Sequence, residues 1–242
     1  MNCRGKTTAT AMCVVLMGAG FVMAEGASVN VTVKWEGKAY KPKRMKNMNK
    51  ECTGFHEGKA PRKAAIKTND NGTLHSVFVY IKNAPKGDYA MPTEPAMLDQ
   101  KGCVYHPRVQ GVRVGQELKI RNSDPTAHNV HFTPKKNKEF NRSQPKKDLV
   151  ETLVFKRAEI MVPVKCDVHP WMVAYVGVMD HPFFGTSRED GTVKIEGLPG
   201  GTYTIVAWHE KYGEKRMEIT VATDESKDVS IEYSRADKKK RK

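Results

Sequence analysis

Hydrophobic and polar residues alternate along most of this chain. Short segments place β-branched or aromatic side chains at every second position, which is the period of a strand with one buried face. Clusters of Gly, Pro, Asn and Asp separate these segments, as in NDNG, NSDP and LPGG. Strands are therefore predicted at 29–35, 75–81, 111–122, 128–132, 152–156, 159–166, 173–179, 191–197, 202–208, 217–222 and 228–233.

The same pattern excludes a helical protein. No stretch of the sequence has the period of a long amphipathic helix. Many short strands at this spacing are typical of a β-sandwich or a barrel. With 242 residues, the chain is long enough for one or two domains with a sizeable core. The sequence therefore predicts an all-β protein.

The first residues have the pattern of an export signal. In MNCRGKTTATAMCVVLMGAGFVMA, two cations precede an apolar run, and small residues follow at the cleavage positions. The run is too short to cross a bilayer, so residues 1–24 are interpreted as a secretory signal peptide. No later segment of the sequence is long and apolar enough to span a membrane. We therefore expect a periplasmic or otherwise secreted protein.

Three cysteines remain after cleavage of this signal, namely Cys52, Cys103 and Cys166. Thiols of exported proteins tend to pair because their compartment is oxidising, and an odd number leaves one over. Only Cys166 has a histidine and a methionine at ligand spacing, in His169 and Met172. We therefore expect a disulfide between Cys52 and Cys103, and a free Cys166 that is buried or bound to a metal.

The chain is strongly basic, with 41 Lys and Arg residues against 27 Asp and Glu residues and a net charge of +14. Part of this excess lies in residues 234–242, which are interpreted as a disordered basic tail. One interpretation is an anionic partner, such as an acidic redox protein or a membrane surface that the tail contacts. The other is a solvated basic surface without a partner. No basic and aromatic motif indicates a nucleic acid partner.

Two motifs, HNVHF and CDVHPWM, carry the candidate chemistry. Two histidines and one cysteine with a weak axial methionine form the ligand set of a blue copper site. His128, Cys166, His169 and Met172 supply this set. The thiolate stabilises Cu(I), imidazoles accept both oxidation states, and the thioether adjusts the reduction potential. The alternative is a turn with an apolar rim, in which Cys166 is a structural thiol and Met172 a core residue.

The spacing of these motifs resembles that of the cupredoxins, and in particular the amicyanin-like and plastocyanin-like members. Their short loop also has two residues between Cys and His and two between His and Met. The resemblance covers residues 112–178 and implies a Greek-key sandwich that binds one type 1 copper through His128, Cys166, His169 and Met172.

The resemblance also implies roles for the neighbours of these ligands. It gives the backbone N–H of Asn129 a hydrogen bond to the Cys166 sulfur, whereas Pro170 has no N–H to offer. It makes His131 a non-ligand, and strand alternation places His131 on the opposite face from His128. Trp171 is expected to be exposed at the mouth of the site. Three lone histidines without ligand spacing are interpreted as structural: His106, His181 and His209.

A second resemblance lies near the C-terminus. The sequence REDGTVKIEGLPGGTYTIVAWH resembles the carboxypeptidase-regulatory or transthyretin-like β-sandwich module. This match is short for an independent domain, which leaves room for N-terminal strands in its sheets. The expected division is a signal peptide, an N-terminal β region with a long loop, a cupredoxin-like core, a transthyretin-like portion and a basic tail, at 1–24, 25–110, 111–183, 184–233 and 234–242 respectively.

These observations favour a carrier of single electrons over an enzyme. Dinuclear copper centres need two cysteines in the loop, and multicopper oxidases and nitrite reductases place a histidine beside the cysteine. Here the neighbours of Cys166 are Lys165 and Asp167. The expected partner is a redox protein. The alternative is a periplasmic protein that binds or delivers copper, or a scaffold that binds carbohydrate or protein, without redox turnover.

Overall fold

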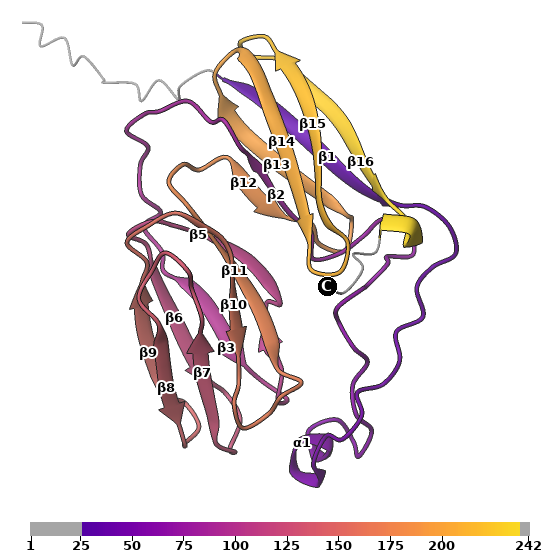
Figure 1. Cartoon of the computed structure of the whole chain (residues 1–242), viewed down its shortest axis with the longest axis vertical. Helices are drawn as coiled ribbons and strands as arrows, with labels where there is room; N and C mark the ends of the chain where they lie inside the picture. The colour runs from indigo at the N-terminus through magenta and orange to yellow at the C-terminus, as the bar shows by residue number, and fades with distance from the viewer. Residues whose placement is uncertain (1–25, 238–242) are drawn as a thin grey trace, which may run out of the picture.

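The computed structural model describes residues 26–237, and sixteen strands account for nearly all of their regular structure (Figure 1). The predicted all-β fold is therefore confirmed. The predicted signal peptide and residues 238–242 of the predicted tail lie outside the described residues. Among the described residues, no helix combines the length and the apolar character that a membrane crossing requires.

Two sheets enclose the core that contains the candidate ligands. One sheet has the order β5-β11-β10-β7-β8 and the other β4-β3-β6-β9. Side chains of both sheets meet in one apolar cluster, in agreement with the predicted cupredoxin-like sandwich. This body, here called the first sandwich, consists of β3 (Ala96–Gln100), β4 (Tyr105–His106), β5 (Val109–Arg113), β6 (Glu117–Asn122), β7 (His128–Phe132), β8 (Phe140–Gln144), β9 (Val150–Val154), β10 (Glu159–Lys165) and β11 (Val173–Met179).

The remaining strands form a second sandwich from both ends of the chain. Its sheets have the orders β13-β1-β16 and β12-β2-β14-β15, with a separate apolar core between them. The first sandwich is thus an insertion between β2 and β12. The second sandwich consists of β1 (Ala27–Trp35), β2 (Phe78–Ile81), β12 (Phe184–Thr186), β13 (Thr192–Leu198), β14 (Gly201–His209), β15 (Gly213–Val221) and β16 (Ser226–Tyr233).

The N-terminal strands complete both sheets of the second sandwich. β1 pairs in parallel with β16, with Val31 opposite Val229, and β2 lies between β12 and β14. The strands of residues 25–110 are therefore divided between the two sandwiches: β1 and β2 belong to the second, and β3, β4 and the start of β5 belong to the first. The domain boundaries expected from the sequence stay a prediction. Pairing between strands far apart in the chain leaves no local signal in the sequence at such a boundary.

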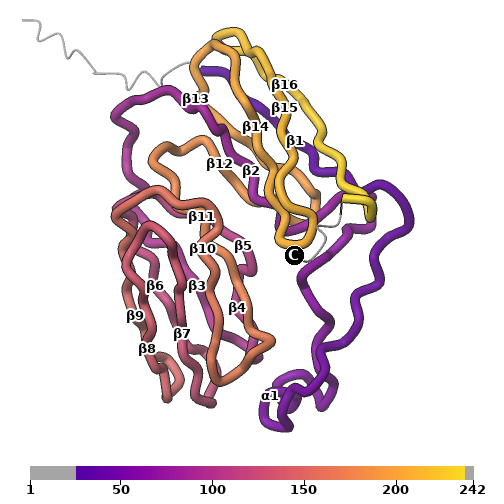
Figure 2. The backbone as a smooth tube through the Cα atoms, viewed as in Figure 1, coloured from indigo at the N-terminus to yellow at the C-terminus, as the bar shows by residue number. Residues whose placement is uncertain are grey.

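Between β1 and β2, a long excursion leaves the second sandwich after Trp35 and returns to its core at Ile66, Leu74 and Val77 (Figure 2). Its two branches meet in a bridge between Arg44 and Arg62, and its tip carries the short helix α1 (Lys50–Gly54). The Asn49 side chain caps this helix by accepting a hydrogen bond from a backbone N–H at 2.7 Å. The predicted disulfide between Cys52 and Cys103 is present and fastens the tip to the first sandwich.

Two glycines allow the sandwiches to approach each other. Gly111 of β5 lies opposite Gly177 of β11, and both face the Phe78 ring of β2. A Cβ atom at Gly177 would lie 2.5 Å from the Met161 side chain and 2.6 Å from this ring. Glycine is therefore required by the packing at this position.

We expect Gly177→Ala to lower the free energy of unfolding by about 1–3 kcal/mol, because an added methyl group overpacks the contact between the sandwiches. Thermal unfolding followed by circular dichroism measures the effect. Gly54→Ala is the matched control, because nothing lies within 4 Å of its added Cβ. Equal stability of the two variants would contradict this account of the interface.

Candidate metal centre

Neighbouring strands bring the two sequence motifs together. His128 is the first residue of β7, and Cys166 directly follows β10, which pairs with β7 through Val164 and Phe132. The loop after β10 closes on itself, since the backbone N–H of Cys166 donates to the Met172 carbonyl at 3.3 Å. The sheet register therefore places one histidine beside a tight loop that carries the other three candidate ligands.

Three of the predicted ligands converge on one buried point. The Nδ1 atoms of His128 and His169 lie 2.9 Å apart, and the Cys166 sulfur lies 3.8 Å from the His169 Nδ1. Their exposed fractions are 1%, 3% and 2%, respectively. Imidazole nitrogen and thiolate sulfur bind a first-row metal such as zinc at ~2.0 and ~2.3 Å. This donor set therefore fits one metal ion.

Two other clusters of candidate ligands overlap with this group. One joins His169 to Cys52 and Cys103, and the other joins His128 to Cys103 and Asp124. Both include sulfur atoms of the disulfide, which offer no thiolate to a metal. Among residues 26–237, Cys166 is the free cysteine, as predicted. The group of His128, Cys166 and His169 is therefore the candidate metal centre.

Met172 lies at the end of the same loop. Its backbone N–H donates to the His169 carbonyl at 2.9 Å, and its side chain is completely buried in the apolar cluster that contains Cys166. This position is compatible with a weak axial ligand and with core packing. The role of Met172 as a ligand stays a prediction.

The surroundings of the Cys166 sulfur favour its charged form. The backbone N–H of Asn129 lies 3.5 Å from the sulfur, as the resemblance implied. Burial raises the pKa of the thiol, but hydrogen bonds from His128 and from backbone N–H groups hold it below its ordinary value. Since the thiolate is the form that binds metals, the site is prepared for a metal ligand.

A buried carboxylate orients His128. Asp124 lies 2.9 Å from the outer nitrogen of this histidine, Nε2, and accepts hydrogen bonds from the backbone N–H groups of Gly102 and Cys103 at 2.7 and 2.8 Å. Burial raises the pKa of Asp124, but its hydrogen bonds outweigh that effect and hold the pKa low. A carboxylate on the outer nitrogen fixes the ring of a metal-binding histidine.

Sequence reasoning missed Asp124 because only the two motifs were considered. A signal was present, since Asp124 stands four residues before His128 in NSDPTAH. The sequence gives no such signal for the backbone N–H groups that donate to this carboxylate, because Gly102 and Cys103 belong to a different loop.

The excursion covers the outer edge of His169. The Nε2 atom of His169 lies 3.5 Å from the Cys52 sulfur and 3.5 Å from the Asn49 amide nitrogen. We call the segment 49–54, with its disulfide, the cap. Burial and the neighbouring His128 lower the pKa of His169. The cap was not predicted, because more than a hundred residues separate it from the loop.

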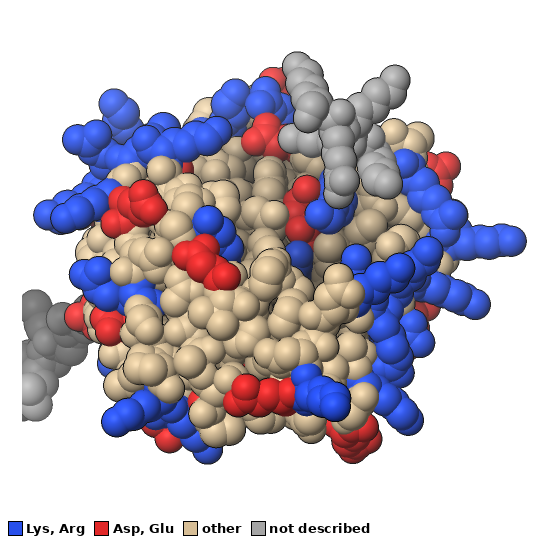
Figure 3. Space-filling model, turned by 60° about the horizontal axis from the view of Figure 1, so that its bottom comes forward, with Lys and Arg blue, Asp and Glu red and all other residues tan. Residues whose placement is uncertain are grey.

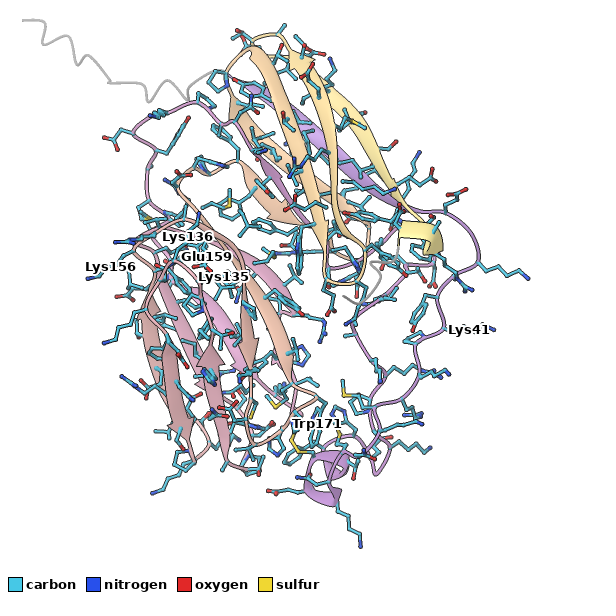
Figure 4. All side chains as sticks on the ribbon, viewed as in Figure 1. Lys41, Lys135, Lys136, Lys156, Glu159 and Trp171 are labelled. Carbon is cyan, nitrogen blue, oxygen red and sulfur yellow. A yellow bond between two sulfur atoms is a disulfide. The ribbon has the colours of Figure 1, made fainter. Side chains whose placement is uncertain are left out.

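Trp171 connects the metal loop to the same disulfide. Its indole N–H donates to the Cys103 carbonyl at 3.0 Å, and its ring centroid lies 5.1 Å from that of His169. Figure 4 shows Trp171 at the end of the first sandwich that faces α1. The side chain is half-buried, so the expected exposure of Trp171 is not observed, because the cap covers one side of it.

The other histidines lie outside the centre. His131 points away from His128, as predicted, with Asp167 at 2.9 Å and Glu139 at 2.5 Å from its ring nitrogens. His181 and His209 are buried, and burial with two nearby cations lowers the pKa of His209 to about 3.

No family model and no curated protein matches this chain. Solved structures show partial likenesses. A Cu(I) amicyanin variant is 24% identical, with 42% of this chain and 98% of that chain covered and a TM-score of 0.32. A purple cupredoxin from Nitrosopumilus maritimus is 22% identical, with 35% and 99% covered and a TM-score of 0.31.

A copper nitrite reductase from Thermus scotoductus is 17% identical, with 40% of this chain and 25% of that chain covered and a TM-score of 0.35. The chain thus spans a quarter of the length of this enzyme.

We expect Asp124→Asn to weaken copper binding by about 10–100-fold, because loss of the carboxylate charge weakens the orientation and basicity of His128. Competition with a chelator of known affinity measures the change. Asp99→Asn is the control, since Asp99 pairs with Arg121 and Ser123 and belongs to none of the candidate ligand groups of the described residues. An unchanged copper affinity in Asp124→Asn would show that this carboxylate does not support the metal ligands.

Proposed function

We propose that this protein carries single electrons, with one type 1 copper held by His128, Cys166, His169 and Met172. The observation that supports this function is the buried meeting of two Nδ1 atoms and one cysteine sulfur within 4.8 Å of one another. A copper ion bound there supplies a one-electron couple between Cu(II) and Cu(I).

The protein holds these donors rigidly. The thiol accepts a backbone hydrogen bond, His128 rests against Asp124, and His169 is enclosed by the cap and Trp171. Rigid donors change little between oxidation states, which keeps the cost of electron transfer small. Burial also excludes water from the ligand atoms.

We also propose that the protein works outside the cytoplasm. The disulfide between Cys52 and Cys103 supports this location, because disulfides form and persist in oxidising compartments. The export signal expected at residues 1–24 agrees with it. Both observations support secretion or residence in a periplasm.

An acidic redox protein is the partner that the charge favours. Lys and Arg side chains gather along the edges of the face in Figure 3, where acidic side chains are fewer. Across the sequence, cations exceed anions by 14. Opposite charge on a partner raises the rate of association, and salt reduces this effect.

One observation favours the alternative of copper binding or delivery without redox turnover. His169 is only 3% exposed, because the cap covers the edge through which a copper ligand would contact a partner. A carrier exchanges electrons rapidly with a redox partner, whereas a protein that only binds or delivers copper does not. This difference separates the two functions.

The proposed centre predicts a colour. Copper(II) added to the metal-free protein should give an intense visible absorption band, since a thiolate donates charge to Cu(II) in this geometry. Cys166→Ser and His128→Gln should lack the band, while His131→Gln on the same strand should keep it. Visible absorption spectra measure all four proteins. A Cys166→Ser protein with the full band would rule out a type 1 site.

We expect Met172→Gln to keep the visible band and to lower the reduction potential, because an oxygen donor stabilises Cu(II) relative to a thioether. Each ~59 mV corresponds to a tenfold change in a one-electron equilibrium, so voltammetry detects a modest shift.

Met179→Gln is the matched control for this variant. Met179 is also buried, at 4% exposed, but it lies in the cluster between the sandwiches. Met179→Gln buries an unpartnered amide and should lose stability without a change in the reduction potential. If Met172→Gln also leaves the potential unchanged, Met172 packs the core and the centre has three protein ligands.

A further inference from the structure

A large cavity lies beside the metal loop. It has a volume of about 900 Å³, is open to solvent on one side, and lies between the first sandwich, the excursion and the segment around β12. Trp171 and Met172 of the metal loop form part of its wall. This volume falls within the range of pockets that hold small molecules.

The charges of this cavity have one sign. Its lining contains no Asp or Glu among the described residues, whereas Arg62, Lys67, Arg108 and Arg188 line it. Clefts lined by one sign of charge concentrate ligands of the opposite sign. The cavity therefore favours anions.

Two of these cations remain available to a ligand. Arg108 is neutralised by Glu210, with N···O distances of 2.6 and 3.0 Å. Lys67 has a looser contact with Glu189 at 3.8 Å. Arg62 and Arg188 are exposed and form no ion pair with a carboxylate in the described part of the chain. The Arg62 guanidinium donates one hydrogen bond to the Pro42 carbonyl, at 2.6 Å, and has further N–H groups for a ligand.

Apolar side chains share the rest of the wall with polar ones such as His75, His106 and Gln110. Trp171, Tyr105 and Phe184 supply aromatic rings, and Met45 and Met97 supply flexible thioethers. Aromatic rings bind planar apolar groups by stacking, and methionine adapts to irregular shapes. A ligand with an aromatic body fits these walls better than an inorganic ion does.

We infer that this cavity binds a small organic anion with an aromatic body, such as an aromatic carboxylate or sulfonate. Its acidic group interacts with the guanidinium groups of Arg62 and Arg188, and its ring packs among Trp171 and the other apolar side chains. Guanidinium suits this role because its planar donors match a carboxylate. The binding site does not require a bound metal, although it shares Trp171 and Met172 with the metal loop.

The test uses the full chain without metal and two fluorescent probes. Anilinonaphthalenesulfonate is an aromatic anion, and N-phenylnaphthylamine has the same rings without the charge. We expect the anion to bind at one site, with quenching of tryptophan fluorescence, and benzoate to displace it better than benzyl alcohol. Added salt should weaken the binding of the anion.

The double variant Arg62→Gln/Arg188→Gln should bind the anion about tenfold more weakly, because two charge-assisted contacts are lost. Its affinity for the uncharged probe should stay unchanged. Arg142→Gln is the matched control, since Arg142 lies over the Phe140 ring and lines a different hollow. Circular dichroism checks that each variant is folded.

Two results would overturn the inference. One is equal affinity of the double variant and the unaltered protein for the anion. The other is a loss of affinity in Arg142→Gln instead, which would place the anion on the basic surface around β8. Because all titrations use metal-free protein, a failure here leaves the copper proposal untouched, and a failure of copper binding leaves this inference untouched.

Discussion

The covalent bond between Cys52 and Cys103 holds together the parts of the molecule that surround the candidate centre. It joins residues 51 positions apart, and closing a loop of this length contributes ~4 kcal/mol in the chain-entropy model. The five residues of α1 are too few to form a stable helix alone. The disulfide and the hydrogen bond that the Asn49 side chain accepts at the start of the helix therefore determine its position. The burial of His169 and the position of Trp171 both follow from the same bond.

Packing between the sandwiches fixes the other wall of the cavity. Gly111 and Gly177 let Phe78 of β2 pack closely against β5 and β11. This contact sets where β12 and the excursion lie relative to the metal loop, because both are attached to the second sandwich. The nested topology therefore has a consequence for function: an insertion between β2 and β12 creates a cavity that neither sandwich would form alone.

Local patterns in the sequence predicted the strands and the ligand motifs, whereas contacts between distant segments were not predictable. Alternation identified long strands such as β1 and β14, and cysteine parity identified the disulfide. It missed β3 and the two-residue β4, β8, whose sequence FNRSQ exposes most of its side chains, and the three-residue β12. Spacing predicted His128, Cys166 and His169, which the structure brings together. The cap and the cavity depend on pairing across the fold, which leaves no periodic signal.

The cap constrains any function of the metal centre. Electron transfer needs a path from the ligand shell to the surface, and the cap closes the path along the outer edge of His169. Trp171 contacts the same histidine and reaches the cavity, so it provides a path that stays open. A carrier would use this side, where the lining cations attract anions, whereas a protein that only binds or delivers copper needs no such path for electrons. The difference between the two proposed functions therefore lies in what occupies the cavity next to Trp171.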